Sequence, residues 1–146
     1  MVGLASTGSL EHLQQLYQLF PPLQEDHIIW KETWGGALQS ACEYDNLSAL
    51  RWLMEHPLGR GVDKNNVALG HCYHIAIAKS HVRVMKYLNE TTHLIVAWLT
   101  NTSIRHGNSE SLRWCVDHDL VNDQEAFSSI IDYAALNGRL DILQFF

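Results

Sequence analysis

The sequence predicts an all-α fold, a solenoid of about four to five helix–turn–helix repeats. Three observations favour this architecture. Windows of similar residues recur along the chain, each window holds a residue suited to a tight turn at the same place, and an apolar stripe of helical period follows that residue.

The recurring windows align without gaps. The clearest is DYAALNGRLDILQFF at 132–146, and the others are HIAIAKSHVRVMKYL (74–88), QSACEYDNLSALRWL (39–53), NTSIRHGNSESLRWC (101–115) and a weaker copy, LASTGSLEHLQQL (4–16). They predict one domain over 1–146, with repeats at roughly 1–22, 26–57, 66–90, 95–119 and 124–146, the last of them truncated. An irregular helical bundle is the alternative.

One column of each window is suited to a left-handed turn. It holds Gly8, Asp45, Ser80, Gly107 and Gly138, which follow one another at intervals of 27 to 37 residues. Glycine takes a positive φ without steric cost, and Asp tolerates it better than most residues. The column therefore predicts a tight turn between two helices in each repeat, at the period of a stacked helical array.

The second helix of each predicted repeat carries an apolar stripe. One column of it is apolar in all five copies: Leu13, Leu50, Met85, Leu112 and Leu143. An aromatic column follows it: Trp52, Tyr87, Trp114 and Phe145. Spacings of this kind place both columns on one broad helical face, so we expect them to be buried. Trp30, Trp34 and Trp98 lie outside the column, and the sequence leaves open whether they anchor an interface or pack half-buried.

Composition and charge restrict the class of protein. Hydrophobic residues make up 47% of the chain and charged residues 18%, a globular composition. The net charge of −6 argues against a nucleic acid or an anionic membrane as the partner. Three widely spaced cysteines predict reduced thiols, and we see no secretory signal or membrane span, so we expect an intracellular, cytoplasmic protein.

The stretch GHCYHIAIAKSH (70–81) suggests a metal site. His71, Cys72 and His74 could belong to a small zinc hydrolase, which is the remote alternative function. However, His81 would lie across a turn from His71, and a zinc site needs three or four ligands that meet at one point. We also find no phosphate loop and no nucleophile elbow. We therefore expect no metal, no cofactor and no enzymatic activity.

The windows resemble ankyrin repeats, in particular the divergent repeats of protists and large viruses. One copy has His74, Ala76, His81 and Val82 in the family's histidine, alanine, post-turn histidine and first apolar positions. The resemblance is carried most fully by Ala134, Ala135, Asn137, Gly138, Leu140, Asp141, Ile142, Leu143 and Phe145. It covers essentially the whole chain and implies a solenoid that binds proteins. Whether the irregular connections are β-hairpins, loops or extra helical turns stays open.

The resemblance also implies where a partner binds. The concave face of such an array is lined by the connection tips and the first helix of each pair. The predicted partner-binding residues are Glu43, Tyr44, Ile75, Lys79, Thr102, Arg105, His106, Tyr133 and Asn137. We expect the partner to be another protein, whose identity the sequence does not give.

A second surface is suggested by the apolar C-terminal residues. Ile142, Phe145 and Phe146 form a predicted docking end, because terminal repeats normally carry a polar outer face. This feature supports the alternative function, a structural subunit or a fragment of a larger assembly, and self-association through this end.

Overall fold

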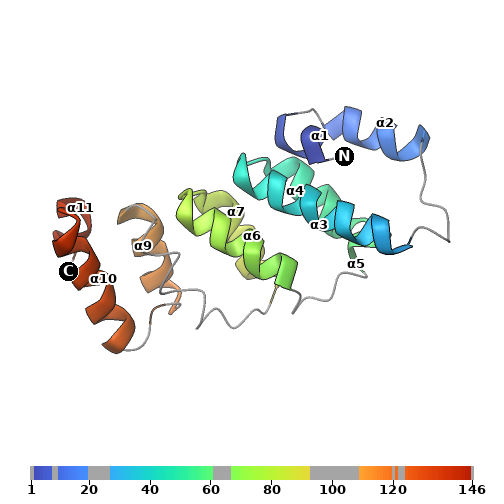
Figure 1. Ribbon diagram of the computed structural model, residues 1–146. Helices are drawn as coiled ribbons and strands as arrows, with labels where there is room; N and C mark the ends of the chain where they lie inside the picture. Colours follow the sequence, from blue (N-terminus) through green and yellow to red (C-terminus); the bar gives the residue numbers. More distant parts are fainter. Residues whose placement is uncertain are drawn as a thin grey trace. The chain divides into compact units, whose positions relative to one another are not determined.

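The structure is a computed structural model that describes residues 2–7, 10–19, 27–60, 67–92, 109–119, 121 and 124–145. Its helices, labelled as in Figure 1, are α1 (Val2–Thr7), α2 (Leu10–Leu19), α3 (His27–Glu43), α4 (Leu47–Glu55), α5 (Pro57–Arg60), α6 (Val67–Ala78), α7 (Val82–Thr91), α9 (Ser109–Asp117), α10 (Gln124–Leu136) and α11 (Leu140–Leu143). No strand occurs in these ranges, so the predicted all-α class is confirmed for them. None of the described helices is both long enough and apolar enough to cross a bilayer.

The chain divides into two compact units, Met1–Cys72 and Tyr73–Phe146. The division falls inside α6, so the first half of this helix belongs to unit 1 and the second half to unit 2.

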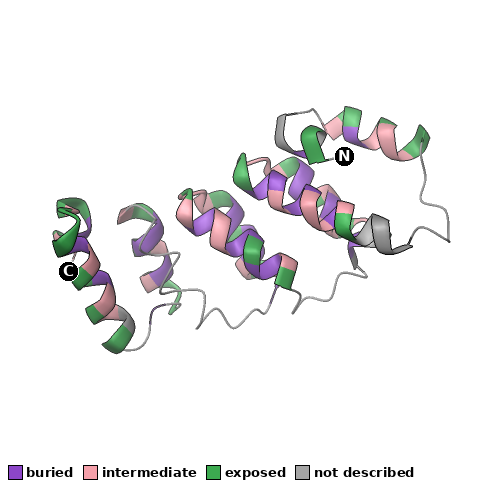
Figure 2. Ribbon diagram, viewed as in Figure 1, coloured by how far each residue is buried: buried purple, intermediate pink, exposed green. Residues whose placement is uncertain are grey.

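In unit 1, α1 packs against α3, α2 against α4, and α3 against α4. The sequence of the amphipathic helix α4 explains how it packs against its neighbours. Leu53 lies one helical turn after Ala49 and Leu50, so the three share one face, and each is at most 1% exposed. Figure 2 colours buried residues purple and exposed ones green along the helices. Burying each leucine contributes about 1.5–3 kcal/mol relative to an exposed side chain.

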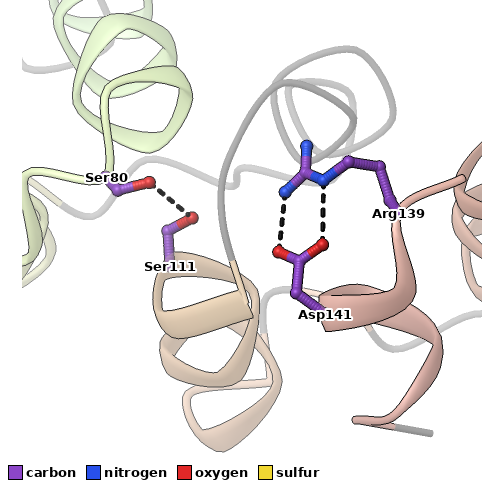
Figure 3. A network of polar contacts seen from close by, with 4 residues as sticks. All are labelled: Ser80, Ser111, Arg139 and Asp141. Carbon is purple, nitrogen blue, oxygen red and sulfur yellow. Dashed lines mark hydrogen bonds and ion pairs between the residues drawn. The ribbon is translucent and has the colours of Figure 1, made fainter. Parts of the chain in front are cut away.

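In unit 2, α7 packs against α9, and α11 against both α9 and α10. The buried face of α7 includes Met85 and Leu88, and that of α9 includes Leu112. The Ser80 hydroxyl, in the turn before α7, donates a hydrogen bond of 3.3 Å to the Ser111 hydroxyl of α9 (Figure 3). This bond joins the turn before α7 to α9 inside unit 2.

The helices α3, α6 and α10 all end in the same left-handed turn. Its central residue has a φ of 52° at Asp45, 59° at Ser80 and 64° at Gly138. The prediction of a left-handed turn is confirmed at these three positions, whereas Gly8 and Gly107 lie outside the described residues.

The same hydrogen bonds close all three turns. The residue after the turn donates its N–H to the carbonyl five residues earlier: Asn46 to Ala41 at 2.9 Å, His81 to Ala76 at 2.9 Å, and Arg139 to Ala134 at 2.8 Å. This is the outer bond of a Schellman motif. The next residue, Leu47, Val82 or Leu140, donates to the carbonyl of the turn residue at 3.0 Å in each case, as in an inverse γ-turn. The backbone path is therefore the same while the side chains differ.

The start of the second helix is stabilised differently in each pair. Asn46 caps α4, because its Oδ1 accepts from the Ala49 N–H at 3.2 Å, and its Nδ2 donates to the Ala5 carbonyl of α1 at 3.1 Å. His81 and Arg139 make no side-chain cap hydrogen bond. Arg139 instead pairs with Asp141 through two hydrogen bonds of 2.9 Å (Figure 3).

Most described helices begin and end inside the predicted repeat ranges, but α5 lies mainly beyond residue 57 and α7 continues to Thr91, one residue past 90. Each range that is described on both sides of its turn contains a helix pair: α3 with α4, α6 with α7, and α10 with α11. The connection after α4 contains the short helix α5. Of the alternatives that the sequence left open, the chain therefore forms an extra helical turn at 57–60. The first half of the predicted repeat at 95–119 lies outside the described residues.

Candidate partner-binding sites

The predicted partner-binding residues that lie next to the turns are exposed. Tyr44, Lys79 and Asn137 each directly precede a turn residue, and Tyr44 has 57% of its surface exposed. Glu43, beside Tyr44, is exposed as well. The alanines four residues before each turn residue are 0% exposed: Ala41, Ala76 and Ala134. One side of each first helix is therefore packed while the residue before the turn faces solvent.

The remaining predicted residues of this set are less accessible or not described. Ile75 and Tyr133, five residues before their turn residues, are half-buried. The Tyr133 carbonyl accepts from both the backbone N–H and the side-chain Nδ2 of Asn137, at 3.0 and 2.9 Å, which fixes the orientation of this amide. Thr102, Arg105 and His106 lie outside the described residues.

The residues predicted to form a docking end are less exposed than expected. Ile142 is only 1% exposed, so it packs inside unit 2 and offers no surface to a partner. Phe145 is half-buried, with the Arg113 guanidinium of α9 5.4 Å from its ring centroid. Phe146 lies outside the described residues. The exposed apolar side chains of α10 and α11 are instead Ile131, Leu136 and Leu140, at 39%, 86% and 65% exposure.

The side chains of the histidine-rich stretch (70–81) lie in different environments. His71 is exposed on α6, His74 is half-buried, and Cys72 is fully buried. Within the part of the chain that the structure describes, no three His, Cys, Asp or Glu side chains come close enough to hold a metal ion. His71, Cys72 and His74 therefore do not meet at one point in the described structure.

The buried cysteines are unsuited to nucleophilic chemistry. All three are free thiols in the interior. A hydrogen bond with the Cys72 thiol, together with burial, raises the pKa of Cys42. Burial raises the pKa of Cys115 to about 12. The thiolate is the reactive species, so the raised pKa values make the Cys42 and Cys115 thiols poor nucleophiles in the folded protein.

Tyr73 is a buried phenol near Cys115. It is 0% exposed, and its hydroxyl has no hydrogen-bond partner among the described residues. Burial and the neighbouring thiol raise its pKa well above the usual value. A phenol held neutral in this way is not available as an acid or base near neutral pH.

An aromatic cluster in unit 1 was missed by the sequence analysis. Its members are Tyr17, Trp34, Trp52 and His56, from three different helical segments and the residue after α4. The His56 ring centroid lies 4.4 Å from that of Tyr17 and 5.1 Å from those of both tryptophans, and the tryptophan centroids are 5.8 Å apart. These are ordinary distances for packed aromatic rings.

Trp34 is the buried centre of this cluster. It is 2% exposed, and its Nε1–H donates to the Leu53 carbonyl at 3.2 Å. A side chain on Gly59 of α5 would overlap this carbonyl, so α5 closes over the hydrogen bond. Trp34 is therefore a core residue, while the Trp30 side chain and Trp98 lie outside what the structure describes.

A second Trp–His pair lies in unit 2. His118 stacks on Trp114 with ring centroids 4.2 Å apart and an interplanar angle of 21°, and its Nδ1 donates to the Trp114 carbonyl at 2.9 Å. The sequence signal was available: the segments RWLMEH (51–56) and RWCVDH (113–118) both place histidine four residues after tryptophan. Because residues four apart share a helix face, this spacing predicts the ring contact.

Comparison with known proteins gave no match: no family model, no curated protein and no solved structure matches the chain.

Proposed function

We propose that the chain is a non-enzymatic protein-binding module, an ankyrin-like array of helix–turn–helix repeats that recognises another protein through the residues beside its turns. Three turns with one backbone path support the repeat architecture. The residue before the turn is exposed in each unit: Tyr44 in unit 1, and Lys79 and Asn137 in unit 2.

The observation that carries the proposal is the exposure of Tyr44. A tyrosine with 57% of its surface exposed is a typical anchor of protein interfaces, because its ring is apolar and its hydroxyl forms a hydrogen bond. The equivalent positions hold a cation, Lys79, and an amide, Asn137, both exposed. Three chemically different side chains on the same backbone geometry are well suited to recognising a specific partner.

Further observations support a binding role over a catalytic one. The thiols are buried, and the pKa values of Cys42 and Cys115 are raised. Reduced, buried thiols also support the proposed intracellular location. The proposed role requires no cofactor.

Site-specific photocrosslinking tests the proposal. A photoreactive amino acid is placed at Tyr44, Lys79 or Asn137 in the full chain, and at the exposed positions Gln15 and Lys86 as matched controls. We expect one discrete protein adduct from the turn positions and none from the controls. Adducts of equal yield at the control positions, or no adduct at any turn position, would contradict the proposal.

A binding measurement with the captured protein then tests the residues themselves. Replacing Tyr44, Lys79 and Asn137 together by alanine should weaken its binding at least about tenfold. The unfolding midpoint should stay the same, because these side chains are exposed. Unchanged affinity would show that the turns do not form the binding site.

A further inference from the structure

Two of the buried thiols lie next to each other inside unit 1. Cys42 is near the end of α3, and Cys72 lies in the middle of α6, far away in the sequence. A hydrogen bond joins their thiols, so the two sulfur atoms are neighbours, and both side chains are 0% exposed. The fold therefore places two free cysteines from different helix pairs together.

Helices α3 and α6 also approach each other closely at a second point. A Cβ on Gly35 of α3 would lie 3.8 Å from the Cβ of Ala68 on α6. The two Cβ atoms of a disulfide are typically about 3.8 Å apart. The backbones of these helices thus come as near to each other as a disulfide between them requires, and small side chains at the contact permit this approach.

The surroundings of the two thiols control when they can react. Leu38, one turn before Cys42, and Leu69, one turn before Cys72, are both 0% exposed. An apolar interior disfavours the thiolate, which is the reactive species. A reagent therefore reaches either thiol only when α3 and α6 separate in a local opening of unit 1. In the closed structure the reduced pair is protected.

Thiol–disulfide exchange supplies a balanced route from this pair to a disulfide. In the opened state one cysteine thiolate attacks a sulfur of a low-molecular-weight disulfide such as glutathione disulfide, which forms a mixed disulfide and releases one glutathione. When the helices close again, the other cysteine attacks the protein sulfur of the mixed disulfide and releases the second glutathione. The two cysteines are oxidised, glutathione disulfide is reduced, and the two thiol protons end on the glutathione molecules.

We propose that Cys42 and Cys72 are a redox modification site, at which a reversible disulfide joins α3 to α6 when low-molecular-weight disulfides accumulate. In a reducing compartment the pair is reduced, and disulfides of such compartments are typically transient and redox-sensing. The bond closes a loop over 42–72, which contains α4 and α5, and so stabilises unit 1 by restricting the unfolded chain. It is independent of the partner recognition proposed for the turns.

Redox titration of the purified full chain tests this site. The protein is equilibrated in native buffer with glutathione disulfide and glutathione at varied ratios, quenched with acid and mapped by peptide mass spectrometry. We expect a peptide pair linked through Cys42 and Cys72 within one chain, which dithiothreitol releases. In urea, the oxidised protein should have an unfolding equilibrium constant for unit 1 that is roughly a hundredfold or more smaller than that of the reduced protein.

Two variants separate this disulfide from general oxidation of the chain. Cys115→Ala is the matched control, because Cys115 is the third buried free thiol and belongs to unit 2. It should form the same linked peptide and gain the same stability on oxidation. Cys72→Ala should form no linked peptide within the chain and gain no stability. Circular dichroism spectra of the reduced proteins establish that each variant is folded.

Three results would overturn the proposal. The absence of the linked peptide in wild type at excess glutathione disulfide removes the site. A linkage that mainly involves Cys115, or that joins two chains, means that the neighbouring sulfurs are not the ones that react. An oxidised protein less stable than the reduced one means that the folded structure does not accommodate the bond. None of these results bears on photocrosslinking at the turns, so the two proposals fail separately.

Discussion

Helices α3 and α10 end in the same turn but differ in what covers them. Leu38 and Cys42 of α3 are fully buried, while the equivalent Ile131 and Ala135 of α10 are exposed. The comparison separates two levels of structure. The turn is determined by a few local residues, whereas burial of the helix is determined by which other helix packs against it.

The largest expected effect comes from placing a charge at equivalent positions of the two helices. Cys42→Lys buries an ammonium group and should cost about 4 kcal/mol or more, enough to unfold unit 1. Ala135→Lys should change the free energy of unfolding by less than about 0.5 kcal/mol, since lysine is a good helix former in an exposed site. Urea unfolding measures both losses. Equal losses would show that Ala135 is covered as well as Cys42.

The next effect concerns the residue eleven positions before each turn residue. Trp34→Ala removes the centre of the aromatic cluster and its hydrogen bond to Leu53, and should cost about 3–5 kcal/mol. Phe127, the equivalent residue of α10, is half-buried, so Phe127→Ala should cost less, about 1–2 kcal/mol. Thermal unfolding of both variants provides the measurement, and a smaller loss for Trp34→Ala than for Phe127→Ala would contradict this assignment of the core.

A smaller effect is expected from exchanging the turn residues. Asp45→Gly removes a non-glycine residue from positive φ and a buried carboxylate oxygen that has no hydrogen-bond partner among the described residues. It should stabilise unit 1 by about 1 kcal/mol, whereas Gly138→Ala should destabilise unit 2 by about 1 kcal/mol. Chemical unfolding of the two variants should show opposite signs, and the same sign in both would mean that the turns are not equivalent.

The smallest expected effect is the contribution of His56, which follows α4, to the pH dependence of the free energy of unfolding. Burial lowers the pKa of His56 from its usual value of 6.5, so the folded state binds this proton less tightly than the unfolded state. The contribution of His56 to stability is fully present above about pH 6.5 and decreases as the pH falls below that value. Unfolding followed across this range should show a weaker pH dependence in His56→Gln than in wild type. The control His71→Gln, at an exposed position of α6, should keep the wild-type profile.

The sequence predicts the parts of this fold that depend on local conformation. Asp45, Ser80 and Gly138 were placed correctly because a left-handed residue after a helix has a strong local preference. Leu50 and Met85 were also predicted correctly, since the helical period defines the buried face of an amphipathic helix.

The features that depend on distant contacts were not predicted. The sequence left open whether Trp34 anchors an interface or packs half-buried, and the structure buries it against residues that lie 17 or more positions away, such as Leu53 across a separation of 19. Ile142 was assigned to an exposed end, but α11 turns this side chain into unit 2 and leaves Leu140 in solvent. Apolar character alone does not determine which of two neighbouring residues faces a partner helix. The assignments at Thr102, Arg105, His106 and Phe146 stay predictions.

The three buried cysteines allow local opening of the two units to be measured by thiol labelling. Cys42 and Cys72 belong to unit 1, and Cys115 to unit 2. A thiol reagent can modify each of them only when the surrounding structure opens, so the labelling rates give a separate opening free energy for each unit. The ratio of these rates measures how cooperatively the two units unfold, without an added spectroscopic label.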